Sequence, residues 1–200
     1  MKISIPGDNL WCPRPLYLFG TLKEDGTPDF GLFCWFSYAW TDSLAAIACI
    51  GENKLTLDRI RAIKVFSANL VTGETLALAD YFGSVSGHDP EKMNIPLEWE
   101  KGAKLDVPVL SASPVAHELE VREMIPLNDE GSTALICEIR NTLIDPALQD
   151  ESVPPSERLR RMNPVTTAGG YEYFGWEGQC LGTWHGLAAQ IRDDIKLSDN

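Results

Sequence analysis

The sequence is poor in positive charge. Lys and Arg together number 17 against 29 Asp and Glu, and the formal net charge at pH 7 is -12. No stretch rich in Lys or Arg interrupts this excess of acid. A surface of this sign repels a nucleic-acid backbone and an anionic membrane face, so we expect neither nucleic acid nor a membrane as a partner. A phosphate group would have to bind at a locally positive spot.

Long hydrophobic runs and cysteine motifs are also missing. The longest apolar run, LAAIACI, is far too short to span a bilayer, and the N-terminal MKISIPGDNLW has no apolar core of signal-peptide length. The cysteines are odd in number and form no CxxC pair: Cys12, Cys34, Cys49, Cys137 and Cys180. Because most of them stand among apolar neighbours, we interpret them as reduced and buried, and we expect a cytoplasmic location.

The familiar catalytic motifs are absent from the sequence. It has three His residues but no Ser/His/Asp set of recognisable spacing, no cluster of metal ligands, no GxGxxG and no P-loop. We therefore assign no catalytic residue and no metal ligand. If the chain is an enzyme, a cofactor carries the difficult chemistry.

The composition and the strand pattern are those of a globular protein. Hydrophobic residues make up 44% of the chain and charged residues 23%, and 200 residues fit a single domain, 1–200. Apolar segments at 14–22, 30–40 and 43–50 predict three strands of an antiparallel meander, with a hairpin turn at Asp25-Gly26. Alternating residues predict a second antiparallel hairpin from 115–125 and 132–144.

Short helices are expected between the strands. The spacing of Leu57, Ile60 and Ile63 predicts a helix after Gly51, followed by a strand at 65–71. Segment 73–83 predicts a second helix that ends with Gly83 as its C-cap residue. A loop and helix excursion at about 146–170 and a C-terminal tail complete the chain. The whole is mainly β with short helices, which favours a closed or partly closed antiparallel barrel.

The start of the helix after Gly51 is the first candidate site. The first turn of a helix offers unpaired N–H groups and a partial positive charge. The hydroxyl of Thr56 and the ammonium of Lys54 would complete an anion site there. The alternative is that Asn53 or Thr56 simply caps the helix.

Two further segments are candidates for binding a ligand. FCWFSYAW, residues 33–40, is an aromatic platform that suits a planar, phosphate-bearing cofactor; the alternative is core or dimer packing. On one continuous strand Phe33, Trp35 and Ser37 would share a face. GSVSGHDPEKM, residues 83–93, offers flexible backbone donors and the charge of Lys92; the alternative is a solvated polar loop.

The three candidate segments, in this order and spacing, resemble those of the flavin reductase-like family. Its members include NAD(P)H:flavin oxidoreductases and flavoredoxin-like electron carriers. The resemblance covers most of residues 14–145, with a weaker match at GGYEYFG, residues 169–175. It implies an antiparallel split β-barrel of the FMN-binding type, FMN as the cofactor and a homodimer with FMN at its interface.

The resemblance also implies a role for each position. The isoalloxazine ring of FMN would lie against Cys34, Trp35, Phe36 and Ser37. The FMN phosphate would be held by Asn53, Lys54 and Thr56, with further contacts from Ser86 and Lys92. The aromatic cluster from Tyr171 to Phe174 would cover the flavin, in this subunit or from the partner.

The implied activity is that of an NAD(P)H-dependent flavin or FMN reductase. Electrons from NADH or NADPH would pass through bound FMN to a small-molecule flavin or a protein acceptor. One alternative is a flavoredoxin-type electron carrier that a protein partner reduces. Another is a split-barrel module that binds a different ligand, such as haem. Many family members have a His where this chain has Ser132 or Thr133, and that departure bears on the use of pyridine nucleotide.

Overall fold

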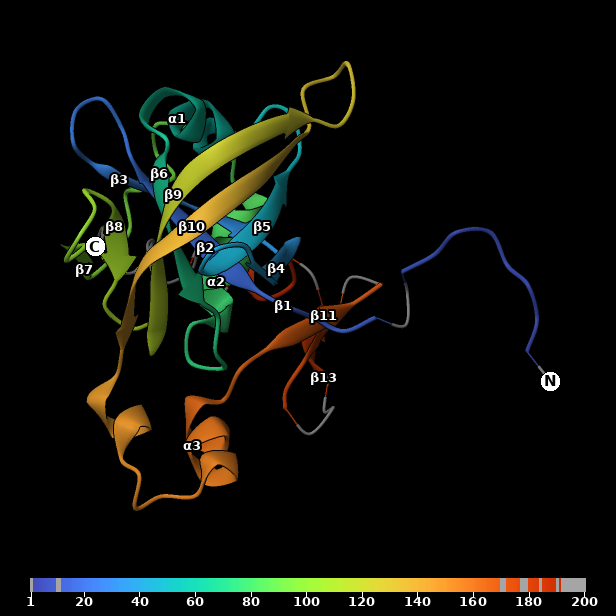
Figure 1. Cartoon of the computed structure of the whole chain (residues 1–200), viewed down its shortest axis with the longest axis vertical. Coiled ribbons are helices and arrows are strands. Elements are labelled where there is room, and N and C mark those ends of the chain that lie inside the picture. Colours follow the sequence, from blue (N-terminus) through green and yellow to red (C-terminus); the bar gives the residue numbers. More distant parts are fainter. Residues whose placement is uncertain are drawn as a thin grey trace.

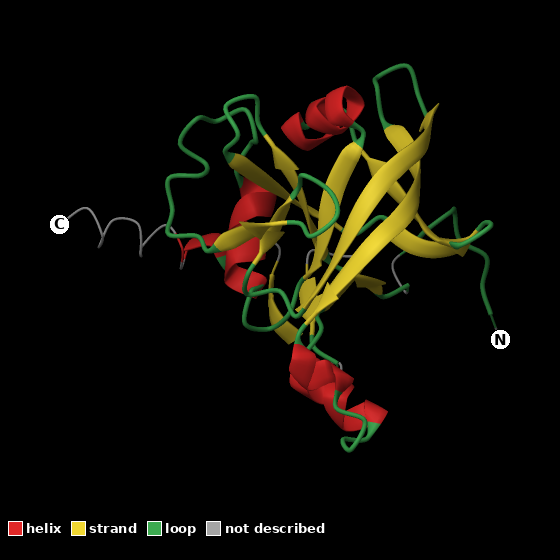
Figure 2. Ribbon diagram, turned by 60° about the vertical axis from the view of Figure 1, so that its left-hand side comes forward, coloured by secondary structure: helices red, strands yellow, loops and turns green. Residues whose placement is uncertain are grey.

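The computed structural model describes residues 2–9, 12–169, 172–176, 180–183, 185–189 and 191. Antiparallel strands dominate the described residues and form a seven-stranded sheet, a four-stranded sheet and a two-stranded pair (Figures 1 and 2). The mainly β, antiparallel split barrel expected from the sequence is therefore confirmed.

The seven-stranded sheet has the strand order β3-β2-β6-β9-β10-β5-β4. Its strands are β2 (Tyr17–Leu22), β3 (Pro28–Phe33), β4 (Phe36–Trp40), β5 (Leu44–Ile50), β6 (Val65–Leu70), β9 (Val115–Pro126) and β10 (Thr133–Ile144). The helices are α1 (Leu55–Ile63), α2 (Leu76–Ser84), the 3₁₀ helix η1 (Pro146–Gln149) and α3 (Pro155–Met162). None of the helices in the described residues is long and apolar enough to pass through a membrane.

The segment from Phe30 to Trp40 is two strands, not the single strand expected. β3 pairs with β2 and β4 pairs with β5, so the two strands lie at opposite ends of the sheet order. Only Cys34 and Trp35 separate them, and the sheet must therefore curl until its two edges meet. The expected shared face of Phe33, Trp35 and Ser37 is wrong, because side chains alternate regularly only within one continuous strand.

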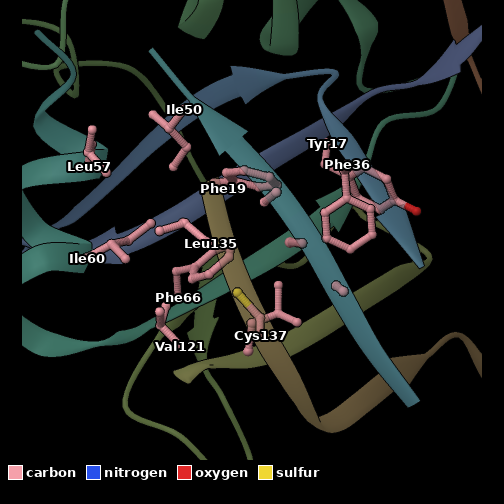
Figure 3. Packing of buried hydrophobic residues seen from close by; sticks show 14 of the residues in the cluster. Tyr17, Phe19, Phe36, Ile50, Leu57, Ile60, Phe66, Val121, Leu135 and Cys137 are labelled. Atoms are coloured by element: carbon pink, nitrogen blue, oxygen red, sulfur yellow. The ribbon is translucent and has the colours of Figure 1, made fainter. Parts of the chain in front are cut away.

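Helix α1 closes one end of the barrel, as its sequence period predicts. Leu57 and Ile60 are fully buried and pack with Phe19, Phe66 and Leu135 in the barrel core (Figure 3). Burial of these apolar side chains is the main stabilising contribution to the barrel. It also fixes the position of the first turn of α1 against the end of β3.

Helix α2 packs closely on β3 through a glycine. Gly83 was expected to follow the helix as its C-cap residue, but it lies inside α2, and Val85 is the C-cap residue. A Cβ atom at Gly83 would lie 3.0 Å from the side chain of Leu32. The small residue therefore permits the approach of helix and strand, which explains why the expectation from Gly as a helix terminator fails.

The hairpin of β9 and β10 is confirmed and is the longest feature of the sheet (Figure 1). Register shifts next to Cys137 and Ile139 interrupt its regular alternation. Glu118 of β9 is fully buried although it is charged. Its carboxylate accepts hydrogen bonds from the backbone N–H groups of residues 103–105 and from Asn141, so four donors satisfy it.

Short strands make up the smaller sheets, and all but the first, which begins the predicted segment 14–22, were missed by the sequence analysis. β1 (Arg14–Pro15), β11 (Thr166–Ala168), β12 (Glu172–Phe174) and β13 (Cys180–Thr183) form one sheet, and β7 (Trp99–Lys101) pairs with β8 (Pro108–Leu110). Asp80 of α2 connects the first of these sheets to the barrel. Its buried carboxylate accepts hydrogen bonds from the hydroxyl of Tyr173 at 2.5 Å and from the N–H groups of His185 and Ala188.

Candidate functional site

A cavity of about 270 Å³ opens where α1 begins. Three segments that are far apart in the sequence form its wall: the end of β3 at 31–33, the turn into α1 at 53–56, and the end of α2 with the following loop at 82–87. Five of the nine residues predicted to bind the cofactor line it: Asn53, Lys54, Thr56, Ser86 and Lys92. The fold thus brings the two predicted polar segments into one pocket.

The first turn of α1 is open to an anion. Lys54 occupies the N-cap position with an extended backbone, and no side chain caps the helix. Asn53 has a left-handed backbone with φ of 56°, a conformation that Asn tolerates better than most residues. The alternative that Asn53 or Thr56 caps the helix is therefore excluded. The Leu57 N–H already donates to the Lys54 carbonyl, and the N–H groups of Leu55 and Thr56, with their partial positive charge, remain available to a ligand.

A buried ion pair lies behind the polar wall. The ammonium of Lys92 is 2.9 Å from a carboxylate oxygen of Asp29, and both side chains are almost completely buried. The hydroxyl of Thr56 donates to the other oxygen of Asp29 over 3.4 Å. Burial lowers the pKa of Lys92, while the charge of Asp29 opposes that shift. Lys54 lines the same pocket at an exposed position.

Glycines allow the walls of the pocket to approach one another. A Cβ atom at Gly87 would lie 2.7 Å from the Cβ atom of Leu55, at the first residue of α1. A Cβ atom at Gly31 would lie 3.0 Å from the hydroxyl oxygen of Thr56. Larger residues at either position would push the helix start away from its neighbours, so these glycines shape the site.

The four predicted residues of the aromatic segment are divided between the surface and the core. Cys34 is half-buried, and Trp35 and Ser37 are exposed. Phe36 lies in the core, with its ring centroid 4.4 Å from that of Tyr17 (Figure 3). Burial raises the pKa of the Cys34 thiol, although the nearby charge of Arg14 opposes this, so Cys34 is not a reactive thiolate.

Arg14 is a candidate that the sequence analysis did not identify. Its guanidinium carbon lies 4.9 Å from the centre of the Trp35 ring. Its Nε and Nη1 atoms are buried and have no hydrogen-bond partner among the described residues. Buried donors without an acceptor are costly, so Arg14 is a further group for polar atoms of a ligand next to Trp35. The only signal in the sequence was a lone Arg at the start of an apolar strand.

In the C-terminal aromatic cluster the structure describes Tyr173, which is buried, and Phe174, which is half-buried. Tyr171 lies outside the described residues. Tyr173 is fully buried, and its hydroxyl is bonded to Asp80. Tyr173 therefore fills the core between α2 and β12, and the expectation that it covers a flavin in its own subunit is wrong.

Size alone does not select the functional cavity. A hollow of about 410 Å³ is lined by residues 109–114 and 143–146 together with Glu100 and Ala116. Its described lining includes two acids, Glu100 and Asp145, and no cation. Among the described residues, no three His, Cys, Asp or Glu side chains are grouped as a metal site requires. The pocket at α1 is therefore the better candidate for an anionic ligand.

The barrel and this pocket together define an antiparallel split-barrel protein with a candidate anion site beside an aromatic segment. Residues 10–160 match the model of the flavin reductase like domain. Because that match covers more than half of the 200 residues, the chain belongs to the flavin reductase-like family, and the resemblance seen in the sequence is confirmed.

Solved structures of low sequence identity share the fold. Flavoredoxin of Desulfovibrio vulgaris is 24% identical with a TM-score of 0.78, covering 92% of this chain and 97% of its own. The 2-nitrobenzoate 2-nitroreductase of Pseudomonas fluorescens is 19% identical with a TM-score of 0.74, covering 92% and 95%. An FMN-binding protein from Thermus thermophilus is 18% identical with a TM-score of 0.70, covering 91% and 97%. No curated protein matches the sequence.

Proposed function

We propose that the chain binds FMN non-covalently, with the phosphate at the start of α1 and the ring beside residues 34–37. The observation that carries this proposal is the pocket in which the uncapped first turn of α1 meets Lys54, Thr56, Ser86 and Lys92. Membership of the flavin reductase-like family supports it. A related fold that binds FMN, in the Thermus thermophilus protein, supports it further.

The residues present fit the parts of FMN. A phosphate dianion suits the N–H groups of α1, the Thr56 hydroxyl and the Lys54 ammonium. Cys34 and Trp35 belong to no strand, and although the Trp35 carbonyl accepts a hydrogen bond from the Cys49 N–H, the N–H groups of both residues are available to the polar edge of a planar ring. Trp35 provides an exposed aromatic surface beside it, and the Arg14 guanidinium lies over the face of that indole.

Bound FMN would supply electron and hydride transfer, which no side chain in the pocket can perform. The protein's own contribution is binding and orientation. Lys54, Thr56 and Ser86 would hold the phosphate, and the segment 34–37 would fix where the ring lies. Burial keeps the Cys34 thiol neutral by raising its pKa, and we assign no general acid or base.

We further propose the activity of an NAD(P)H-dependent flavin or FMN reductase. The test is the absorbance spectrum of the purified protein, before and after anaerobic addition of NADH and of NADPH. We expect a yellow protein whose flavin band is bleached by one nucleotide within seconds. A colourless protein that takes up no FMN would refute the cofactor, and it would favour a split-barrel module for another ligand such as haem.

The second candidate is a flavoredoxin-type electron carrier reduced by a protein partner. The likeness to flavoredoxin of Desulfovibrio vulgaris favours it, as does the presence of Ser132 and Thr133 where many family members have a His. In the same experiment, a yellow protein that neither nucleotide reduces, but that dithionite reduces, would support the carrier and exclude the reductase.

We propose a homodimer that buries the edge of the sheet at β4 and β5. Exposed apolar side chains gather there: Trp35, Tyr38, Trp40, Leu44 and Ile47. Contiguous apolar surface of this kind usually marks an interface, and a two-fold axis is the commonest way to cover it with a second copy. The interface would border residues 34–37 and so place FMN near both subunits. Light scattering at micromolar concentration measures the assembly directly.

A cytoplasmic location accompanies this proposal. The thiols of Cys12, Cys34, Cys49 and Cys137 are free, which suits a reducing compartment. Most of the cysteines were expected to be buried; Cys137 is buried, Cys34 and Cys49 are half-buried, and Cys12 is exposed. The proposed partners are the second subunit and a flavin or protein electron acceptor, with neither nucleic acid nor membrane.

A further inference from the structure

The cation deepest in the proposed FMN site is already paired. Lys92 and Asp29 are 3% and 1% exposed, and the ammonium lies 2.9 Å from the carboxylate. Hydrogen bonds between such buried charges are short and strong, and separating them leaves an uncompensated charge in a medium of low dielectric constant. The pair therefore behaves as one neutral unit at the back of the pocket.

The net charge that a ligand meets follows from this pairing. Among the described residues that line the pocket, Lys54 and Lys92 are the two cations. Asp29 does not line the pocket, yet its carboxylate balances Lys92 from behind. The remaining positive charge is that of Lys54, which is exposed and screened by water. The pocket thus has less attraction for a phosphate dianion than its two lysines suggest.

We infer that Asp29 is a specificity-determining residue that limits how strongly the site prefers a phosphorylated flavin over an unphosphorylated one. This inference rests on the proposed FMN site and goes beyond it. Asp29 acts through Lys92, and the preference for FMN over riboflavin follows the summed charge of positions 29 and 92. The two flavins differ only in the phosphate, so the ratio of their dissociation constants isolates this charge.

A purely structural role for Asp29 makes the opposite prediction. If the carboxylate served only to aim the Lys92 ammonium at the phosphate, its loss would misplace Lys92 and weaken FMN binding. The two roles are therefore distinguished by the sign of the change, and not only by its size.

The experiment measures dissociation constants for FMN and riboflavin with flavin-free protein at fixed ionic strength. The variants are Asp29→Asn, Lys92→Gln and the double variant, with Glu91→Gln as the matched control. Glu91 is an exposed neighbour of Lys92, so its substitution removes the same unit of charge where water screens it. Thermal unfolding with and without each flavin accompanies every titration.

We expect the preference for FMN to rise by about tenfold or more in Asp29→Asn, because the phosphate then replaces Asp29 as the counter-charge that keeps Lys92 protonated. Lys92→Gln should lower the preference by a similar factor. The preference of the double variant for FMN should lie within about threefold of the wild-type preference, and so should that of Glu91→Gln. Riboflavin affinity should change little in all four proteins.

Because an unpaired buried Lys92 destabilises the flavin-free fold, FMN should also raise the melting temperature of Asp29→Asn more than that of the wild type. If Asp29→Asn does not fold, the double variant provides the test, because its side chains at positions 29 and 92 are both neutral. A loss of FMN preference in the double variant would overturn the inference. An unchanged or reduced preference in folded Asp29→Asn would also overturn it. Failure of the wild type to bind either flavin would refute the proposed function instead.

Discussion

Replacing Thr56 by Val tests the phosphate site with the least disturbance to the fold. Thr56 is 3% exposed, lines the pocket and lies in the first turn of α1. Val has nearly the same shape, so the substitution removes one hydroxyl without opening a cavity. A hydrogen bond to a charged group contributes about 1.5–3 kcal/mol. The Thr56 hydroxyl must give up its 3.4 Å bond to Asp29, so the lower figure applies, and FMN affinity should fall about tenfold.

The assay is a titration of flavin-free protein with FMN and, in parallel, with riboflavin. Riboflavin affinity should be unchanged, since riboflavin has no phosphate for Thr56 to contact. The bond to Asp29 is long, so the loss of stability should stay below about 1 kcal/mol in chemical denaturation. Equal losses for both flavins would indicate a disturbed fold, and FMN affinity equal to that of the wild type would refute the assignment of Thr56.

Thr21→Val is the matched control for this substitution. Thr21 is also fully buried, but it does not line the pocket, and its hydroxyl has no hydrogen-bond partner among the described residues. Removing an unpaired buried hydroxyl should leave FMN affinity unchanged and hold or raise stability. A tenfold loss of FMN affinity in Thr21→Val would show that the titration does not report on the pocket.

Three further predictions concern assembly, pH and local order. Trp40 is 77% exposed at the edge of the sheet, and we expect dimerisation to require it. Trp40→Glu should therefore give monomers in light scattering, and an unchanged dimer mass would contradict the proposed interface. Burial lowers the pKa of His117 from its ordinary 6.5 to about 4. Between these two pH values the imidazole is protonated in the unfolded chain and neutral in the folded one. The free energy of unfolding should therefore fall by about 3 kcal/mol as the pH is lowered from above 6.5 to 4. Urea unfolding should show this loss in the wild type and a flatter dependence in His117→Gln, because the Gln side chain binds no proton in this pH range. The Glu118 carboxylate accepts hydrogen bonds from the N–H groups of residues 103–105, so Glu118→Ala should speed amide hydrogen exchange at these residues and leave the amides of α1 protected. Unchanged exchange at residues 103–105 would contradict the assigned contact.

The parts of the fold that depend on local pattern could be predicted from the sequence. The period of Leu57 and Ile60 identified α1, and strict alternation identified the hairpin of β9 and β10. The break at Cys34 and Trp35 could not be predicted in this way. Its residues are as apolar and aromatic as a strand requires, and the break follows from closure of the barrel, which is a property of the whole sheet.

The candidate site shows the same division between local and distant information. Asn53, Lys54 and Thr56 were predictable because a helix start is a local feature with a known affinity for anions. The pairing of Lys92 with Asp29, 63 residues away, depends on the fold. Because of this pairing, the positive charge of Lys92 is balanced by the carboxylate and is not free for a ligand. Sequence pattern therefore located the pocket but did not reveal its charge.

The most direct test of the account is the crystal structure of the protein with bound FMN. We predict that the phosphate lies at the first turn of α1, within hydrogen-bond distance of the Thr56 hydroxyl, with the ring beside residues 34–37. A phosphate bound elsewhere, with the first turn of α1 in contact only with water or protein, would contradict the central claim.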